Sequence, residues 1–214
     1  MALLPRKANW EAEQPNRMDK LEVARCPLGT ALALFLQDLD PVSVHSLASA
    51  ACELLEHLAS KVGKKPFNYY MLSSFPGSSP ADLRRVQHEF WNAFKYPLRP
   101  DQKRERKDGP LLASVSDADN DHRLFVGWYD YANATQRLPT EASLFLIWYQ
   151  CLYPKEVGIH LPSGMIEEFF PNLPSYDRAA QKQALRRTIE VHRALVHIDD
   201  PFVEQGPLIL PRMS

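Results

Sequence analysis

The stretch DPVSVHSLASAACELLEHLASKVG, from Asp40 to Gly63, predicts one long amphipathic helix and decides the fold class. Asp40 is suited to accept hydrogen bonds from the free amides of the first turn, and Pro41 fits the first helical position. Gly63 is suited to the left-handed conformation that ends many helices. Apolar residues recur at steps of three and four and are expected to face a core: Val44, Leu47, Ala51, Leu55, Leu58 and Val62. The opposite, polar face is expected to carry Ser46, Ser49, Glu53, Glu56 and Ser60.

Composition and charge are those of an ordinary soluble domain. The 214 residues are 45% hydrophobic and 24% charged, which suits one domain with a sizeable core. The formal net charge of −1 gives no generic attraction to nucleic acid or to an acidic membrane surface. The N-terminus lacks the apolar segment of a signal peptide, and the longest strongly apolar run, Leu144 to Tyr149, is too short to cross a bilayer. We therefore expect a cytoplasmic, bacterial-type protein with no membrane partner.

The rest of the chain predicts further helices joined by proline-rich connections. Periodicity and capping residues favour an all-α fold, a single-domain bundle of about five or six main helices with a long irregular connection between residues 97 and 118. We expect a loosely ordered arm over residues 1–17, the helical bundle over 18–198 and a proline-punctuated tail over 199–214. The main helices are expected at residues 18–38, 40–63, 79–97, 119–137, 139–152 and 175–198, with a short helix starting near Ser163.

Some local features carry expectations about packing. Pro27 and Gly29 are expected to break or restart the first helix. The helix that Ser79 opens is expected to bury Leu83, Val86, Phe90 and Phe94. In the last helix Leu185 and Val191 are expected to face inward. The opposite face of that helix carries Arg178, Lys182, Arg186 and Arg193.

Metal or covalent chemistry has little support in the sequence. Glu53–His57 and Asp119–His122 have the spacing of helical metal ligands, but a di-iron bundle needs four inward carboxylates, and Glu53 is expected on the solvent face. Glycine-rich phosphate loops and a strand–turn–helix serine elbow are absent. We therefore predict no metal and no cofactor. The cysteines are odd in number and widely spaced, and are predicted to be small buried side chains: Cys26, Cys52 and Cys151.

The central helix resembles the first core helix of bacterial helical proteins of the HEPN type (higher eukaryotes and prokaryotes nucleotide-binding). In that family a later helix carries Arg-Asn, three or so further residues and a histidine, and the arginine and histidine cut RNA at a dimer interface. The matching segment is Trp91-Asn92-Ala93-Phe94-Lys95-Tyr96, in which tryptophan and tyrosine replace the arginine and the histidine. A second match, Arg187 to His192, places the two side chains about 140° apart on an ideal helix. The resemblance implies a helical fold with a degenerate site.

Three functions from different classes stay open. The leading hypothesis is a non-enzymatic interaction or regulatory protein that forms a homodimer or binds a protein partner. The runner-up is a metal-independent HEPN-type RNase, and the third is a small-molecule-binding helical protein with an aromatic-lined pocket. The aromatic residues considered for that pocket also have the spacing of core residues: Trp128, Tyr129, Tyr131, Trp148, Tyr149 and Tyr153. The candidate binding residues are Asn92, Lys95 and Tyr96, at the C-terminal end of their helix, and His45 on the central helix. No catalytic residue is assigned.

Overall fold

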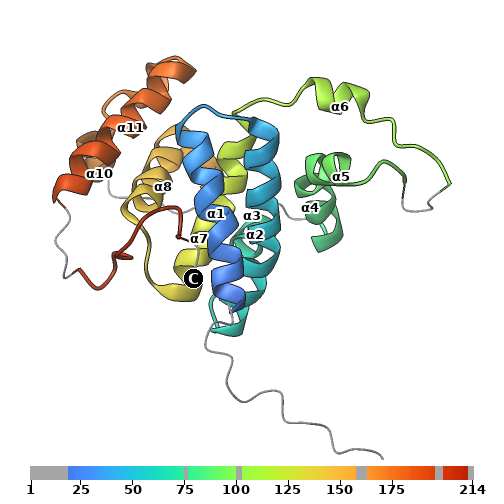
Figure 1. Ribbon diagram of the computed structural model, residues 1–214, viewed down its shortest axis with the longest axis horizontal. Helices are drawn as coiled ribbons and strands as arrows, with labels where there is room; N and C mark the ends of the chain where they lie inside the picture. Colours follow the sequence, from blue (N-terminus) through green and yellow to red (C-terminus); the bar gives the residue numbers. More distant parts are fainter. Residues whose placement is uncertain (1–18, 75–76, 100–102, 158–162, 196–199, 212–214) are drawn as a thin grey trace, which may run out of the picture.

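The computed structural model describes residues 19–74, 77–99, 103–157, 163–195 and 200–211, so the predicted arm over residues 1–17 lies outside the described residues. Within these ranges the chain is all-α and forms a single domain (Figure 1). The helices outnumber the predicted set because short helical segments occupy the connections. They are α1 (Lys20–Leu36), α2 (Pro41–Lys61), α3 (Phe67–Ser74), α4 (Pro80–Gln87), α5 (Glu89–Lys95), α6 (Gly109–Ala113), α7 (Asp119–Thr135), α8 (Thr140–Leu152), α9 (Pro154–Val157), α10 (Ser163–Phe169), the 3-10 turn η1 (Leu173–Ser175) and α11 (Arg178–Leu195).

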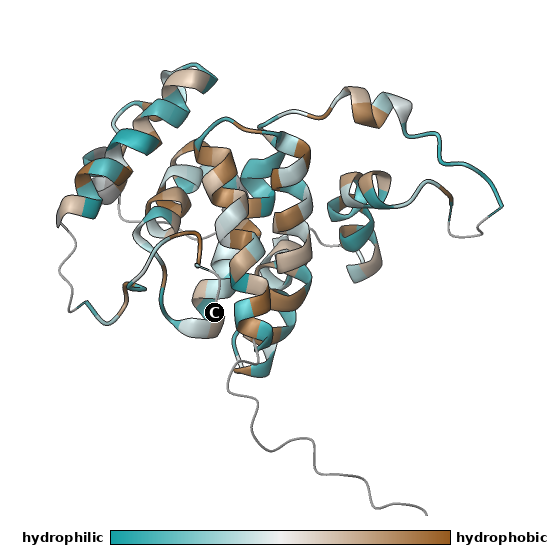
Figure 2. Cartoon of the chain, in the orientation of Figure 1, coloured by the Kyte–Doolittle hydropathy of each residue, from teal (hydrophilic) through white to brown (hydrophobic). Residues whose placement is uncertain are grey.

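Helices α1, α2, α7 and α8 enclose the core, and α11 packs against α8 (Figure 1). Aromatic side chains fill the centre: the Trp148 ring lies 6.1 Å from Phe35 and 5.7 Å from Phe145. In Figure 2 the hydrophobic colour runs along much of α1 and α2, whereas the segment between α5 and α6 is mostly hydrophilic. Among the described residues, no helix is both long enough and apolar enough to cross a membrane.

The central helix α2 has the ends that its sequence predicts. The Asp40 carboxylate accepts hydrogen bonds from the amides of Val42 and Ser43 at 3.1 and 3.0 Å, and Gly63 has a φ of +76°. Val44 and Leu55 of the expected stripe are fully buried. Val62 is 55% exposed, because it follows the last helical residue and points past the end of the core.

The prediction that Ser49 lies on the solvent-facing side of α2 is wrong. The Ser49 side chain is fully buried, because α2 packs against both α1 and α7 and only part of its polar face reaches solvent. The hydroxyl of Ser49 accepts a hydrogen bond of 2.9 Å from Arg123 Nε on α7. Glu53, by contrast, is exposed as expected.

The predicted break at Pro27 is wrong. Helix α1 runs through Pro27 without interruption, and the burial of Ala24, Leu28 and Ala31 on its inner face outweighs one missing backbone hydrogen bond. Gly29 has a different role, since a Cβ built there would lie 2.2 Å from the Leu208 carbonyl oxygen. The glycine thus lets the C-terminal segment approach the helix.

The helix predicted from Ser79 to Pro97 is two helices. Ser79 and Asp82 form the expected capping box, but α4 ends at His88, whose φ and ψ of −100° and 7° redirect the chain into α5. The break separates the expected inner stripe: Val86 is 65% exposed, whereas the rings of Phe90 and Phe94 pack against His45.

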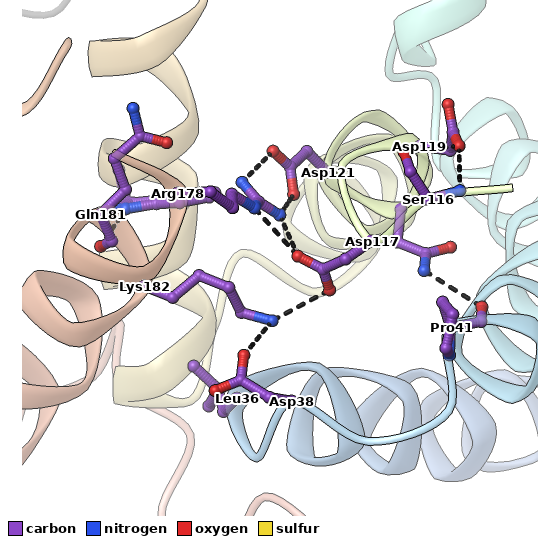
Figure 3. A network of polar contacts seen from close by, with 12 residues as sticks. Leu36, Asp38, Pro41, Ser116, Asp117, Asp119, Asp121, Arg178, Gln181 and Lys182 are labelled. Carbon is purple, nitrogen blue, oxygen red and sulfur yellow. Dashed lines mark hydrogen bonds and ion pairs between the residues drawn. The ribbon is translucent and has the colours of Figure 1, made fainter. Parts of the chain in front are cut away.

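Arg178 and Lys182, on the basic face of α11, form ion pairs within the bundle, although the sequence places this face opposite the inward one. Arg178 donates hydrogen bonds to Asp117 and Asp121 at 2.6 and 2.7 Å, and Lys182 pairs with Asp38 and Asp117 at 2.7 and 2.9 Å (Figure 3). These ion pairs join α11 to the start of α7 and to the turn after α1. On the same helix Leu185 is buried as predicted, but Val191 is 57% exposed and Ile189 takes the inward position.

Residues 200–211 lie on the bundle. Arg25 of α1 donates to Glu204 at 2.9 Å and to the Leu208 carbonyl at 2.8 Å, and the Tyr131 hydroxyl donates to Glu204 at 2.7 Å. Leu208 is buried beside them. This part of the predicted tail therefore has fixed contacts with α1 and α7.

Candidate functional site

A polar cavity of about 480 Å³ lies between α2, α4 and α7, next to the start of α3. Helices α2 and α7 run in the same direction along it, since His45 contacts Asn120 and Ser49, further along α2, contacts Arg123, further along α7. The lining side chains are mostly charged or hydrogen-bonding: Glu53, Glu56, His57, Ser60, Asn68, Arg84, Gln87, His88, Arg123 and Asp130, with Cys52 and Val126.

Arg123 supplies a buried positive charge to this cavity. The residue is 4% exposed, and its Nε donates a hydrogen bond to the Ser49 hydroxyl. Its Nη2 has no hydrogen-bond partner among the described residues. Buried guanidinium groups are normally paired, because leaving a charged donor without a partner costs free energy.

Asp130 supplies a buried acid to the same cavity. Its Oδ1 accepts a hydrogen bond of 2.8 Å from the Phe67 amide and so anchors the first turn of α3. Its Oδ2 has no hydrogen-bond partner in the described part of the chain. Burial raises the pKa of the Asp130 carboxyl to about 7, because the Phe67 amide only partly offsets the loss of hydration and the charge of Glu56 adds to the rise.

The rim comes from α4 and α2. The Nδ1 atom of His88 lies 3.8 Å from Glu53 Oε1, and Gln87 donates to Asn68 at 2.7 Å. Burial and the positive charge of Arg123 lower the pKa of His88, so its imidazole is neutral near pH 7 and can accept a proton. Of His88 and Asp130, Asp130 has the pKa that suits proton transfer near neutral pH.

Covalent and metal chemistry is less well supported. Burial raises the pKa of the Cys52 thiol to about 11, which keeps it protonated and unreactive at neutral pH. Cys52 and Cys151 are buried, as predicted, whereas Cys26 is only half-buried, and none of the three forms a disulfide. Asp119 accepts a hydrogen bond from the Ser116 amide while His122 contacts the Tyr149 hydroxyl, so that pair does not converge. Among the described residues, no cluster of His, Cys, Asp and Glu is suited to hold a metal ion.

The binding residues predicted from sequence lie outside the lining of this cavity. Lys95 is exposed, with its Nζ 5.0 Å from the Trp91 ring centre and 4.9 Å from that of Tyr96. Asn92 is half-buried on the same helix. His45 is buried beneath α5, where its Nδ1 donates to Asn120 at 3.2 Å. His45 packs against Phe90 and Phe94 of α5, and among the described residues no hydrogen bond or ring contact joins it to the other three candidates. The role of all four in binding remains a prediction.

A second groove, between α1, α11 and residues 207–209, is a weaker candidate. Its volume is about 390 Å³. Its arginines already have partners within the bundle, since Arg186 binds Asp38 and Arg193 binds Glu141. The polar cavity differs because its buried charges retain free hydrogen-bonding atoms.

Sequence reasoning missed Arg123 and Asp130, although a signal was present. The two residues are seven positions apart and so share one face of the predicted helix. That face also carries Val126, and a charged pair on a face with apolar neighbours indicates either a buried site or a border of the core. The local sequence gives no sign that Arg84 and His88 line a cavity, because it does not indicate which helix their own helix packs against.

A comparison of the chain with protein-family models, with curated proteins and with solved structures finds no match. The geometry of the cavity is therefore the basis for inferring a function.

Proposed function

We propose that this chain is a binding protein for a small charged organic molecule, which it holds in the polar cavity between α2, α4 and α7. The observation that carries the proposal is that two residues lining one cavity, Arg123 and Asp130, each have a buried polar atom, Nη2 and Oδ2, without a partner among the described residues. Leaving a buried polar atom without a partner costs roughly 1–3 kcal/mol, and more for charged groups. A ligand that offers an acceptor to Arg123 removes such a cost in the bound state.

The volume and the chemistry of the cavity favour a small polar ligand. A cavity of about 480 Å³ lies within the range of small-molecule sites. Phe, Trp and Tyr are absent from its described lining, whereas Trp128, Trp148 and Tyr149 are buried in the core. The small-molecule hypothesis is thus proposed here with a polar pocket in place of an aromatic one.

Thermal melting with a ligand panel tests the proposal. The panel contains carboxylates, phosphates and nucleotides, and a ligand that binds only the native state raises the melting midpoint. Arg84→Gln, on the cavity wall, should reduce the shift. Arg85→Gln is the matched control, because Arg85 is the next residue and its side chain is 80% exposed. Loss of the shift in both variants, or no shift with any anion, contradicts binding at this site.

A second candidate, metal-independent RNA cleavage, is favoured by one observation. Arg84, His88 and Arg123 line the same cavity, so a phosphate could be held by arginine while the neutral His88 accepts the 2′-hydroxyl proton. Incubation of total RNA with the wild type and with His88→Ala, in the presence of EDTA, tests this. Cleavage that persists in His88→Ala, or that disappears in His192→Ala instead, speaks against the cavity as an RNase site.

The interaction hypothesis remains a prediction, as does the homodimer. Sedimentation velocity at two protein concentrations tests self-association directly. A concentration-dependent dimer would support the homodimer without deciding what the cavity binds.

A further inference from the structure

The two unpartnered atoms of the cavity belong to opposite ends of it. Arg123 and Asp130 are seven residues apart on α7, and a helix rises 1.5 Å per residue, so their backbones are separated by roughly 10 Å along the axis. Because α2 runs parallel to α7, its residues follow the same order, from Cys52 and Glu53 beside Arg123 toward Ser60 beside Asp130.

One end of the cavity holds Arg123, with Glu53 near it on the rim. The Nη2 of Arg123 has no partner among the described residues, and the guanidinium cannot swing away because its Nε is bonded to the buried Ser49. A guanidinium nitrogen without a partner favours an anionic group, to which it can donate a charge-assisted hydrogen bond.

The other end is acidic. Asp130 is held by the Phe67 amide through Oδ1, which leaves Oδ2 as a free acceptor, and the charge of Glu56 acts on the same carboxyl. Two carboxyl groups beside each other favour a cation, because a positive charge stabilises both in the ionised form. Asn68 follows Phe67 and lines this part of the cavity.

We infer that the ligand is an elongated zwitterion, with an anionic group bound at Arg123 and an amine bound between Asp130 and Glu56. The inference rests on the proposed binding function and adds the class of ligand. The two charged groups of the ligand are separated by up to roughly 10 Å, the rise of the helix between the two anchors.

A series of ω-amino carboxylates measures this spacing. Isothermal titration at pH 8, above the pKa of about 7 for Asp130, is carried out with 4-aminobutyrate, 6-aminohexanoate and 8-aminooctanoate. Octanoate and octylamine serve as probes with one charge each. We expect affinity to rise with chain length, and the best amino carboxylate to bind about tenfold or more tightly than octanoate, as one additional charge-assisted hydrogen bond provides.

Asp130→Asn identifies the end at which the amine binds. The amide oxygen can still accept from the Phe67 amide, so the fold is retained while the charge is lost. In this variant the affinity advantage of 8-aminooctanoate over octanoate should shrink, because only Glu56 is left to pair with the amine, while octanoate itself should bind as it does to the wild type. Equal binding of octanoate and 8-aminooctanoate to the wild type overturns the zwitterion and leaves the anion site standing. If none of the probes binds and no anion of the panel raises the melting midpoint, both the inference and the proposed function fail.

Discussion

Arg123 on α7 donates from Nε to the hydroxyl oxygen of Ser49 on α2 at 2.9 Å, and both side chains are buried. The bond ties together α2 and α7, two of the helices that line the polar cavity. It also fixes the guanidinium of Arg123, whose Nη2 has no partner among the described residues. One buried hydrogen bond therefore serves both the packing of the bundle and the geometry of the proposed site.

Ser49→Ala should destabilise the protein by roughly 1–3 kcal/mol, because it leaves Arg123 Nε buried without an acceptor. The helical pattern alone placed Ser49 on the polar face, where the expected effect is below about 0.5 kcal/mol. Urea denaturation measures the difference in unfolding free energy. Ser60→Ala is the control, because the Ser60 hydroxyl is exposed and bonds only within its own helix in the described structure. Equal effects of the two changes would contradict the buried bond.

Leu55→Ala should cost about 2–5 kcal/mol of stability, since Leu55 is fully buried in the core. Val62→Ala provides the comparison within the same predicted stripe. At 55% exposure Val62 should contribute less than about 0.5 kcal/mol. A similar shift in denaturant midpoint for both variants would mean that the core reaches the end of α2.

Asp130→Asn should change how stability depends on pH. The folded pKa of Asp130 is raised from 3.8 to about 7, so its contribution to stability is fully present below pH 3.8 and is lost as pH rises through 7. The shift corresponds to about 4 kcal/mol at 1.36 kcal/mol per unit. The asparagine variant does not titrate, so it should gain stability relative to wild type between pH 4 and pH 8. Parallel stability curves for the two proteins would rule out a perturbed Asp130.

His45→Gln should make the protein less sensitive to acid. Burial and the charge of Arg123 lower the pKa of His45 from 6.5 to about 4, so the neutral ring stabilises the native state above pH 6.5. That stability, about 3 kcal/mol, is lost as pH falls from 6.5 through 4. Denaturation between pH 4 and pH 7 should show a flatter profile for the variant. An unchanged slope in His45→Gln would contradict the assignment to His45.

Gly29→Ala should loosen the C-terminal segment. A Cβ at this position would lie 2.2 Å from the Leu208 carbonyl oxygen and 2.3 Å from Arg25 Nη1, which is far inside normal contact. We expect a loss of roughly 1–3 kcal/mol and faster amide hydrogen exchange in residues 203–210. Gly109→Ala is the control, because its added Cβ would have no neighbour within 4 Å. Unchanged exchange in Gly29→Ala would show that the segment does not depend on this approach.

The helix ends were predictable from sequence because their interactions are local. Asp40 bonds to amides two and three residues away, and Ser79 and Asp82 bond to each other across one turn. Gly63 takes the left-handed conformation within its own turn. For such features, the residues that interact are also close in the sequence.

The sequence by itself thus determined the helical class, the limits of α2 and the apolar residues at its centre, such as Val44 and Leu55. Only the tertiary structure decided which polar side chains are buried. Ser49 and Arg123 are 74 positions apart, and Lys182 and Asp117 are 65 apart, so no local pattern encodes their pairing. The candidate site depends on the same relationship: Arg123 and Asp130 line a cavity to which α2, α4 and the start of α3 also contribute, and burial leaves each of the two with an unpartnered atom among the described residues.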